Sequence, residues 1–365
     1  MKFNKRANLL AGCLLGLILL GANVQANPFE YRWQQLATGV WAAIRQDPFE
    51  LPQEGNAVFV VTDRGVVLFD AGGSPLMGES IVAKIRSVTD QPITHVVLSH
   101  WHADHMRGLQ SIQKAFPQVQ IFAHPYSRDF IVSTQDAWLK RRVSMVPNIR
   151  KALATTLSNN KDLSGRELIK EEKTWLETGQ GILDQLDAEN NRTTFVIPNA
   201  SISGELTLYL GGTEIRFMHL GNAHTAGDLI MWLPQQKIVA TGDIVTGPVP
   251  LMPSVYLPDY LQVLSTIKGL GFKTLVPGHG PVESDAAYID LLADTMAAVS
   301  KQVNSLVAQG LNEKDVATKI DYTEMEKRFT HGDPFLSNRF KDYVTAALAH
   351  AAFLAETGKK PTETF

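Results

Sequence analysis

Four side chains that can bind a metal ion lie close together in residues 100–105, which read His-Trp-His-Ala-Asp-His. The segment directly follows an apolar run that we expect to form a strand. In an extended segment, side chains two residues apart point the same way, so His100 and His102 can chelate one ion. Asp104 and His105 stand where the chain is expected to turn, and they can face a second ion beside the first.

Three further candidate ligands each follow an expected strand, in sequences typical of turns: His224, Asp243 and His279. Imidazole and carboxylate ligands without sulfur suit zinc, although iron or manganese would also be tolerated. The whole set fits two Zn²⁺ ions, with His100, His102 and His224 on one ion, Asp104, His105 and His279 on the other, and Asp243 bridging them.

Such a pair of ions supports hydrolysis. A water that bridges two metal ions about 3.5–4 Å apart has its pKa drawn toward neutrality and becomes a hydroxide nucleophile. The ions also polarise the carbonyl or phosphoryl group under attack. Asp104 has a second, catalytic role in this interpretation, because its free carboxylate oxygen can orient the hydroxide or accept its proton.

The elements that position these residues fall into two strand-rich halves, each followed by a helix. Helices are expected to begin at Ser74-Pro75, where a cap precedes proline, and near residue 259. The pattern predicts an α/β fold in which two sheets pack face to face with helices outside. The expected strands are 40–44, 57–62, 66–69 and 93–99 in the first half, and 194–197, 205–210, 214–220, 228–233, 237–241 and 274–276 in the second.

Two further segments read as helical. Residues 126–190 form a predicted insertion with apolar side chains at helical spacing, and an insertion of that length often covers a site. Residues 285–365 form a predicted helical C-terminal extension, whose apolar stripe is more typical of a core or dimer contact than of a ligand site. The catalytic domain is therefore expected to span residues 27–284.

Four blocks in this order carry a resemblance to a known family: HxHxDH, Gly-x-x-His-Thr-x-Gly at 221–227, Thr-Gly-Asp at 241–243, and Pro-Gly-His-Gly at 277–280. From about Val40 to Glu283 the chain resembles the metallo-β-lactamase superfamily. The resemblance implies a four-layer αββα sandwich, a dinuclear metal site on the seven residues above, and hydrolysis as the reaction.

Departures from particular branches narrow the prediction. Cys13 is the only cysteine, which excludes the β-lactamases that use a cysteine ligand. His102 stands where the flavodiiron relatives have glutamate, and Asp243 resembles the thioesterase, lactonase and phosphodiesterase branches. We therefore predict an exported dinuclear zinc hydrolase that cleaves an ester, lactone, thioester or amide bond. The alternatives are a β-lactamase-like resistance enzyme and a non-catalytic metal-binding accessory protein of a periplasmic pathway.

Other polar residues are expected to have supporting or structural roles. Asp70 ends a strand at the same edge and is expected to orient a ligand histidine. His95 is expected to be structural, whereas His124 and His219 are candidates for the pocket wall. The two remaining histidines, His331 and His350, are expected at the surface.

Residues 1–26 predict a secretory signal peptide, with a basic start, a short apolar run and a cleavage site after Ala26. The run is shorter than the roughly 20 residues of a membrane span. A lipoprotein with lipid on Cys13 is the alternative. The expected location is the periplasm or the medium.

Charge limits the expected partners. Loss of three cations with the signal would change the formal net charge from −3 to about −6. An acidic protein is a poor ligand for nucleic acid, which is bound through Lys and Arg. We expect a small-molecule substrate and no stable membrane insertion, with a homodimer as an alternative to a monomer.

Overall fold

The computed structural model describes residues 29–45, 53–162, 165–252 and 255–363. The predicted signal peptide, including Cys13, lies outside the described residues. None of the helices in the described ranges is long and apolar enough to cross a membrane.

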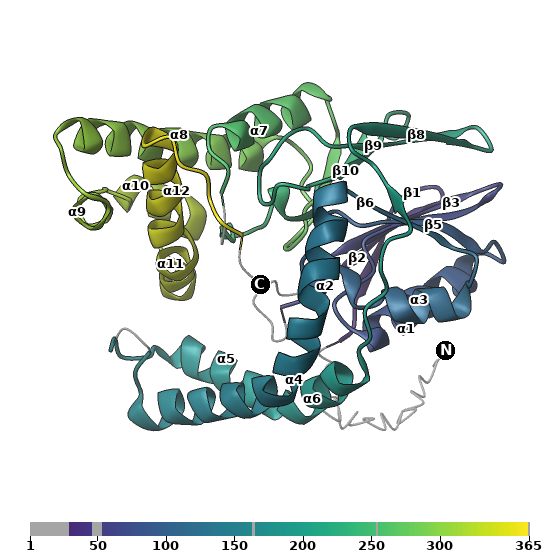
Figure 1. Cartoon of the computed structure of the whole chain (residues 1–365), viewed down its shortest axis with the longest axis horizontal. Helices are drawn as coiled ribbons and strands as arrows, with labels where there is room; N and C mark the ends of the chain where they lie inside the picture. Colours follow the sequence, from purple (N-terminus) through teal and green to yellow (C-terminus); the bar gives the residue numbers. More distant parts are fainter. Residues whose placement is uncertain (1–28, 46–52, 163–164, 253–254, 364–365) are drawn as a thin grey trace, which may run out of the picture.

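Two sheets make up the strand-rich part of the molecule, in the right half of the view in Figure 1. The first has seven strands in chain order, antiparallel from β1 to β4 and parallel from β4 to β7. Its strands are β1 (Arg32–Ala37), β2 (Val40–Ile44), β3 (Ala57–Thr62), β4 (Gly65–Phe69), β5 (Ile93–Val97), β6 (Gln120–Ala123) and β7 (Ala200–Ser201).

The second sheet has the order β12-β11-β10-β9-β8. Only the β11–β12 pair is parallel. Its strands are β8 (Glu205–Leu210), β9 (Thr213–Met218), β10 (Ile230–Leu233), β11 (Ile238–Ala240) and β12 (Thr274–Val276).

Alternation along the strands builds four layers. Val58 and Val60 of β3 point inward and meet Phe217 and Met231 of the second sheet in one buried cluster. The intervening Phe59 points outward, where it packs with α1 (Pro75–Val88) and α3 (Leu109–Ala115) in a second cluster. The outer face of the second sheet is covered by α7 (Asp259–Gly269) and α8 (Ala287–Ala308) in a third. The fold is therefore the predicted αββα sandwich.

Local signals placed several elements correctly. The Ser74 side chain accepts a hydrogen bond from the Met77 backbone N–H and caps α1, which begins at Pro75. An N-cap of this kind satisfies a backbone donor that the helix itself leaves open. The strands predicted at 40–44, 57–62, 205–210 and 274–276 have those bounds in the structure.

One predicted strand, at 194–197, is wrong, since these residues have no regular secondary structure. The Gln110 side chain binds the backbone N–H of Thr194 at 2.5 Å, and Arg142 donates to the carbonyl of Thr193 at 2.6 Å. Phe195 packs against the helix-covered side of the first sheet. Side chains from α3 and the helical insertion thus form hydrogen bonds with backbone groups that would otherwise pair with a neighbouring strand.

The segment between the two sheets holds α4 (Pro125–Asn159), α5 (Lys170–Gly181) and α6 (Leu183–Arg192). Beyond α8 the chain continues with α9 (Glu313–Ala317), α10 (Thr323–Thr330), α11 (Pro334–Phe340), a π-helical turn at Lys341–Thr345 and α12 (Ala346–Glu356). Most of the predicted apolar stripe of α8 is buried in the core cluster that α12 also joins. The boundaries predicted for the domains stay predictions.

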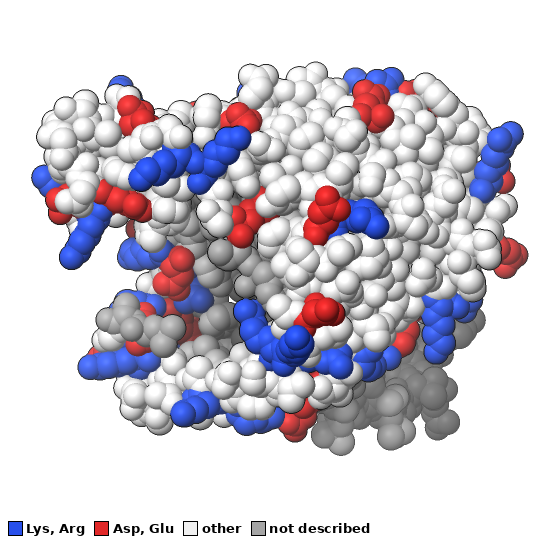
Figure 2. Space-filling model, in the orientation of Figure 1, with Lys and Arg blue, Asp and Glu red and all other residues white. Residues whose placement is uncertain are grey.

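The space-filling view shows a hollow between the C-terminal helices and α5, with side chains of both charges around it (Figure 2).

Candidate metal centre

The loop after β5 carries four of the seven candidate ligands. His100 follows the strand by a few residues and is buried, and His102 has an extended backbone at the start of α2 (Ala103–Met106). Asp104 and His105 then lie in the first turn of this short helix. The change from extended chain to helix directs the two pairs of side chains to different places.

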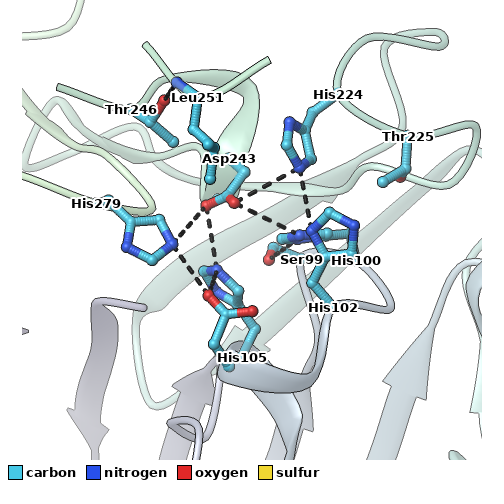
Figure 3. A network of polar contacts seen from close by, with 12 residues as sticks. Ser99, His100, His102, His105, His224, Thr225, Asp243, Thr246, Leu251 and His279 are labelled. Atoms are coloured by element: carbon cyan, nitrogen blue, oxygen red, sulfur yellow. Dashed lines mark hydrogen bonds and ion pairs between the residues drawn. The ribbon is translucent and has the colours of Figure 1, made fainter. Parts of the chain in front are cut away.

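The other three candidate ligands come from the second half of the chain. His224 lies in the loop between β9 and β10, Asp243 lies in a 3₁₀ turn (Gly242–Ile244) after β11, and His279 follows β12. All three are buried. They reach the same edge of the sandwich as the loop after β5 because the inner faces of the two sheets are packed together (Figure 3).

The seven side chains form two groups that share Asp243, and the ligand atoms within each group lie within 4.8 Å of one another. We call them the first and second ligand groups. Their members are His100, His102, His224 and Asp243 in the first, and Asp104, His105, His279 and Asp243 in the second.

Asp243 faces both groups, one with each carboxylate oxygen. Its Oδ2 lies 3.5 Å from Nε2 of His224 and 3.7 Å from Nε2 of His100. Its Oδ1 lies 3.1 Å from Nε2 of His105 and 3.5 Å from Nε2 of His279. A carboxylate in this position can bridge two ions.

Several of these atoms have no hydrogen-bond partner within the described residues, although they are buried. They are Nε2 of His100, His105 and His279, and Oδ1 of Asp243. Leaving a buried polar atom unpaired costs about 1–3 kcal/mol, so converging unpaired atoms of this kind need another partner. The donor set, imidazole nitrogens with carboxylate oxygens, fits divalent metal ions.

Electrostatics differ between the two groups. Burial lowers the pKa of His100 and His102 and brings that of His224 to about 3. Neutral imidazole is the form that binds a metal ion. The first ligand group is therefore held ready to coordinate.

In the second ligand group, the combined effect of the carboxylates on the histidine pKa values exceeds the effect of burial. Burial opposes a charge on His105 and His279, yet Asp243 and Asp104 raise the pKa of both imidazoles. Burial likewise opposes ionisation of Asp104 and Asp243, but the two histidines hold the pKa of each carboxyl well below its usual range. The carboxylates and imidazoles of this group thus favour each other's charged forms, and a bound metal ion would take the place of the imidazole protons.

Asp70 orients His105, as expected from the sequence. Its Oδ2 lies 2.9 Å from Nδ1 of His105, and Ser99 donates to both carboxylate oxygens, from its backbone N–H at 2.7 Å and its hydroxyl at 2.8 Å. The carboxylate at Nδ1 leaves Nε2 of His105 free to point at Asp243. Asp70 itself has a φ of 61°, a left-handed conformation at the end of β4.

Close packing of the backbone holds Asp243 in place. A Cβ at Gly278 would lie 2.0 Å from Oδ1 of Asp243, so a larger residue there would displace the carboxylate. Gly242 has a φ of 52°, and a Cβ there would lie 2.4 Å from that of Ser99. The glycines of the Thr-Gly-Asp and Pro-Gly-His-Gly blocks are thus needed for the approach of these loops.

The remaining histidines lie outside both groups. His124 and His219 stack on each other with ring centroids 4.3 Å apart, and each binds backbone through Nδ1. His95 stacks on Phe122, in keeping with a structural role. His331 and His350 are exposed, as expected.

Sequence reasoning missed Glu54, a buried carboxyl close to the second ligand group. Neither carboxyl oxygen has a hydrogen-bond partner among the described residues, and the Nη2 of Arg107 lies 3.7 Å away. Burial raises the pKa of Glu54 to about 7. A Cβ at Gly73 would overlap its Oε2, so Gly73 makes room for it. Glu54 stands in no ligand motif, and only its burial distinguishes it.

A model of the family described as the metallo-beta-lactamase superfamily matches residues 52–279, more than half of the 365-residue chain. The chain belongs to the metallo-beta-lactamase superfamily. The match covers every residue of the two ligand groups.

Proteins with similar sequences include a sulfatase and a thioesterase. A linear primary-alkylsulfatase of Pseudomonas sp. (strain ATCC 19151) is 21% identical over 273 residues, which are 70% of this chain and 48% of that protein. An atrochrysone carboxyl ACP thioesterase of Claviceps purpurea (strain 20.1) is 23% identical over 88 residues, 24% of this chain and 28% of that protein. The chain spans about half the length, or less, of these relatives.

Among solved structures, the inverting sec-alkylsulfatase Pisa1 from Pseudomonas sp. has the same fold, with a TM-score of 0.59 at 15% identity. The likeness covers 89% of this chain and 50% of that one. It therefore extends beyond the residues that the family model matches.

Proposed function

We propose that this protein is an exported hydrolase with two metal ions that cleaves an ester, lactone, thioester or amide bond. The observation that carries the proposal is the position of Asp243, with one carboxylate oxygen toward each ligand group. In this proposal the seven side chains of the two groups are the metal ligands. Zinc is the expected metal because the donors are imidazole and carboxylate.

When bound, two such ions lower the pKa of a water molecule and polarise the bond that it attacks. The chain's own residues would position the attacking water and accept its proton. Oδ2 of Asp104 lies 3.0 Å from Nε2 of His279 and 3.3 Å from Nε2 of His105, and its side chain is the partly exposed one of the second ligand group. Asp104 can therefore ligate through one oxygen, while the other orients the attacking water or accepts its proton.

Metal analysis tests the site. We expect close to two ions per chain in the protein purified with zinc. In Asp243→Ala, which lacks the carboxylate shared by the two ligand groups, we expect fewer than two. One ion per chain after full zinc supplementation would contradict the bridging role of Asp243, since a mononuclear site needs only three or four ligands.

A panel of chromogenic ester, lactone, thioester, amide, phosphodiester and cephalosporin substrates, with and without a chelator, tests the bond type. We expect chelator-sensitive turnover of an acyl substrate. Turnover of cephalosporin alone would favour the β-lactamase-like alternative instead.

A second candidate is hydrolysis of a sulfate monoester. It is favoured by the likeness to two alkylsulfatases, one matching 70% of the chain in sequence and the other 89% in structure. An aryl sulfate and a linear alkyl sulfate in the same panel separate the two candidates. Chelator-sensitive release of sulfate, without acyl cleavage, would replace the first proposal with the second.

Export is supported by residues 1–26, whose pattern is typical of a signal peptide. We expect the mature protein to begin at Asn27 and to be recovered from the periplasm or the medium. Mass spectrometry of the purified protein checks this, and a diacylated Cys13 would show a lipoprotein instead.

A further inference from the structure

The C-terminal tail returns to the metal centre. After α12 ends at Glu356, the chain runs back toward the catalytic half, where Figure 1 shows it entering between the C-terminal helices and α4. Most of this tail is exposed, including residues 356–360 and Thr362, but the side chain of Glu363 is partly buried. The tail therefore places the Glu363 carboxylate partly inside the protein.

Three donors from distant parts of the chain hold that carboxylate. The indole Nε1 of Trp101 donates to Oε2 at 2.5 Å. The backbone N–H of Ala226 and the hydroxyl of Tyr256 donate to Oε1 at 2.6 Å and 2.8 Å. Burial and the neighbouring Glu363 carboxylate raise the pKa of Tyr256, so its hydroxyl stays protonated and remains a donor.

Two of the three donors belong to the loops that carry the first ligand group. Trp101 lies between His100 and His102, and its ring centroid is 4.3 Å from that of His102. Ala226 follows His224 by two residues. The bound carboxylate thus lies next to the first ligand group.

Rigid packing supports two of the donors. The Trp101 indole is buried and stacks on Phe130 of α4 with ring centroids 3.9 Å apart. The backbone N–H of Tyr256 donates to the carbonyl of Ala223, which ties the Tyr256 loop to the His224 loop. Donors that are already fixed hold a ligand at low entropic cost.

We propose that Trp101 Nε1, the Ala226 N–H and the Tyr256 hydroxyl form a carboxylate-binding subsite for the substrate, and that Glu363 fills it in the free protein. The proposal rests on the proposed hydrolase function and adds a substrate class, namely compounds with a carboxylate group beside the scissile bond. The tail is a tethered competitor, because it presents the same chemical group to the same donors. A substrate carboxylate must displace Glu363. The apparent association constant for the substrate is therefore the intrinsic constant multiplied by the fraction of molecules in which the subsite is free.

Binding of glutarate to the zinc-loaded protein tests the subsite without any need for turnover. Glutarate carries the carboxylate that Glu363 presents, and its binding can be followed by titration calorimetry. In Glu363→Gln, which removes the competing charge but keeps the shape, we expect glutarate to bind about 10-fold more tightly than in the native protein. The control Thr362→Ala alters an exposed neighbour in the tail and should bind glutarate as the native protein does.

Tyr256→Phe, made in the Glu363→Gln background, removes one donor while the tail no longer competes. A hydrogen bond to a charged group is worth roughly 1.5–3 kcal/mol, which corresponds to a loss of at least 10-fold in glutarate affinity. Because Tyr256 is in neither ligand group, direct binding of glutarate to the metal ions would not be weakened by this change. Glutarate affinity that is insensitive to both substitutions would overturn the subsite.

Kinetics with a matched pair of esters test the substrate class. The pair is 4-nitrophenyl butyrate, which is neutral, and the mono-4-nitrophenyl ester of glutaric acid, which has a free carboxylate. In the Glu363→Gln background, Tyr256→Phe should raise the KM of the acidic ester about 10-fold and change that of the neutral ester less than 2-fold. Equal effects on both esters would contradict a substrate carboxylate in the subsite.

The two experiments separate the two proposals. Specific glutarate binding without hydrolysis of either ester would retain the subsite and count against acyl hydrolysis. Hydrolysis of both esters with no effect of either substitution would retain the hydrolase and remove the subsite.

Discussion

Two buried polar clusters among the described residues differ in how their charges are balanced. The first is the metal centre, made of the two ligand groups. The second, which we call the Glu172 cluster, consists of Arg166, Glu172, Asn338 and Arg339 and joins the helical insertion to α11. Both lie between segments that are far apart in sequence, but only the Glu172 carboxylate accepts hydrogen bonds at both of its oxygens.

In the Glu172 cluster both oxygens of the carboxylate accept hydrogen bonds. Its Oε1 accepts from Arg166, Asn338 and Arg339 at 2.9–3.1 Å, and its Oε2 accepts from Arg166 and from the Ile169 N–H. Burial raises the pKa of Glu172, but the hydrogen bonds from Arg166 and its other partners lower it overall. The charge on Glu172 is therefore balanced by arginine side chains of the chain itself.

In the metal centre the buried acceptors and imidazole nitrogens face one another instead. Nε2 of three histidines and Oδ1 of Asp243 have no hydrogen-bond partner within the described residues. The Glu172 carboxylate is balanced by arginines, which keep their charge, whereas the imidazoles of the metal centre can give up their protons to bind a metal ion. Substitutions in the two clusters should accordingly affect different properties.

The largest effect is expected for Asp104→Ala, in the metal centre. Turnover of the substrate found in the panel should fall about 10²-fold or more, since general acid–base groups alone contribute about 10²–10⁴-fold. The midpoint of thermal unfolding should change little, because the first ligand group keeps all its members. Near-normal turnover with two metal ions bound would mean that Asp104 is not catalytic.

Asp70→Asn should weaken binding of the second ion roughly 10–100-fold, the usual cost of losing a carboxylate behind a ligand histidine. One amide oxygen cannot replace both carboxylate oxygens, which accept from Ser99 and orient His105. Competition with a chromogenic chelator measures the affinity. Asp90→Asn, at an exposed acid, is the control and should bind both ions normally.

Glu172→Gln should reverse this pattern, with lower stability and unchanged kcat. Breaking a buried ion pair typically costs about 3–5 kcal/mol. Because Arg166 is about one-third exposed and screened by solvent, we expect a loss of about 2 kcal/mol in the free energy of unfolding. Urea unfolding measures it, and the neighbouring exposed Glu171→Gln is the matched control. A fall in kcat without a fall in stability would link this cluster to catalysis.

A smaller, pH-dependent effect is expected at His124, which belongs to neither cluster. Burial and the stacked His219 lower the pKa of His124 to about 4. Between about pH 6.5 and 4 the unfolded chain binds a proton there that the folded chain does not, so stability falls as the pH falls. The contribution should be about 1 kcal/mol after solvent screening.

His124→Asn tests this effect because asparagine keeps the cap on the Tyr126 N–H and cannot take up the proton. Unfolding at pH 7 and pH 4.5 should show a smaller pH dependence in the variant than in the native protein. An equal dependence would assign the effect to other groups.

Much of the site could be predicted because its signals are local. The spacing of His100, His102, Asp104 and His105 depends only on a strand that ends and a helix that begins. The strand at 40–44 and the one at 57–62 were found from their own residues. The half-exposed edge strand β1 was not, since its residues alternate weakly, and the strand expected at 194–197 failed because distant side chains take its backbone groups.

The sequence by itself determined the seven candidate ligands, the order of the strands that carry them, and the family. Tertiary structure alone decided which oxygen of Asp243 faces which ligand group and that Glu363 reaches Trp101 across 262 residues. It also decided that the Glu54 carboxyl is buried with no hydrogen-bond partner among the described residues. The reason is physical. Strand, turn and helix preferences are set by neighbours along the chain, whereas burial and the pairing of a side chain depend on which distant segments the packed core brings beside it.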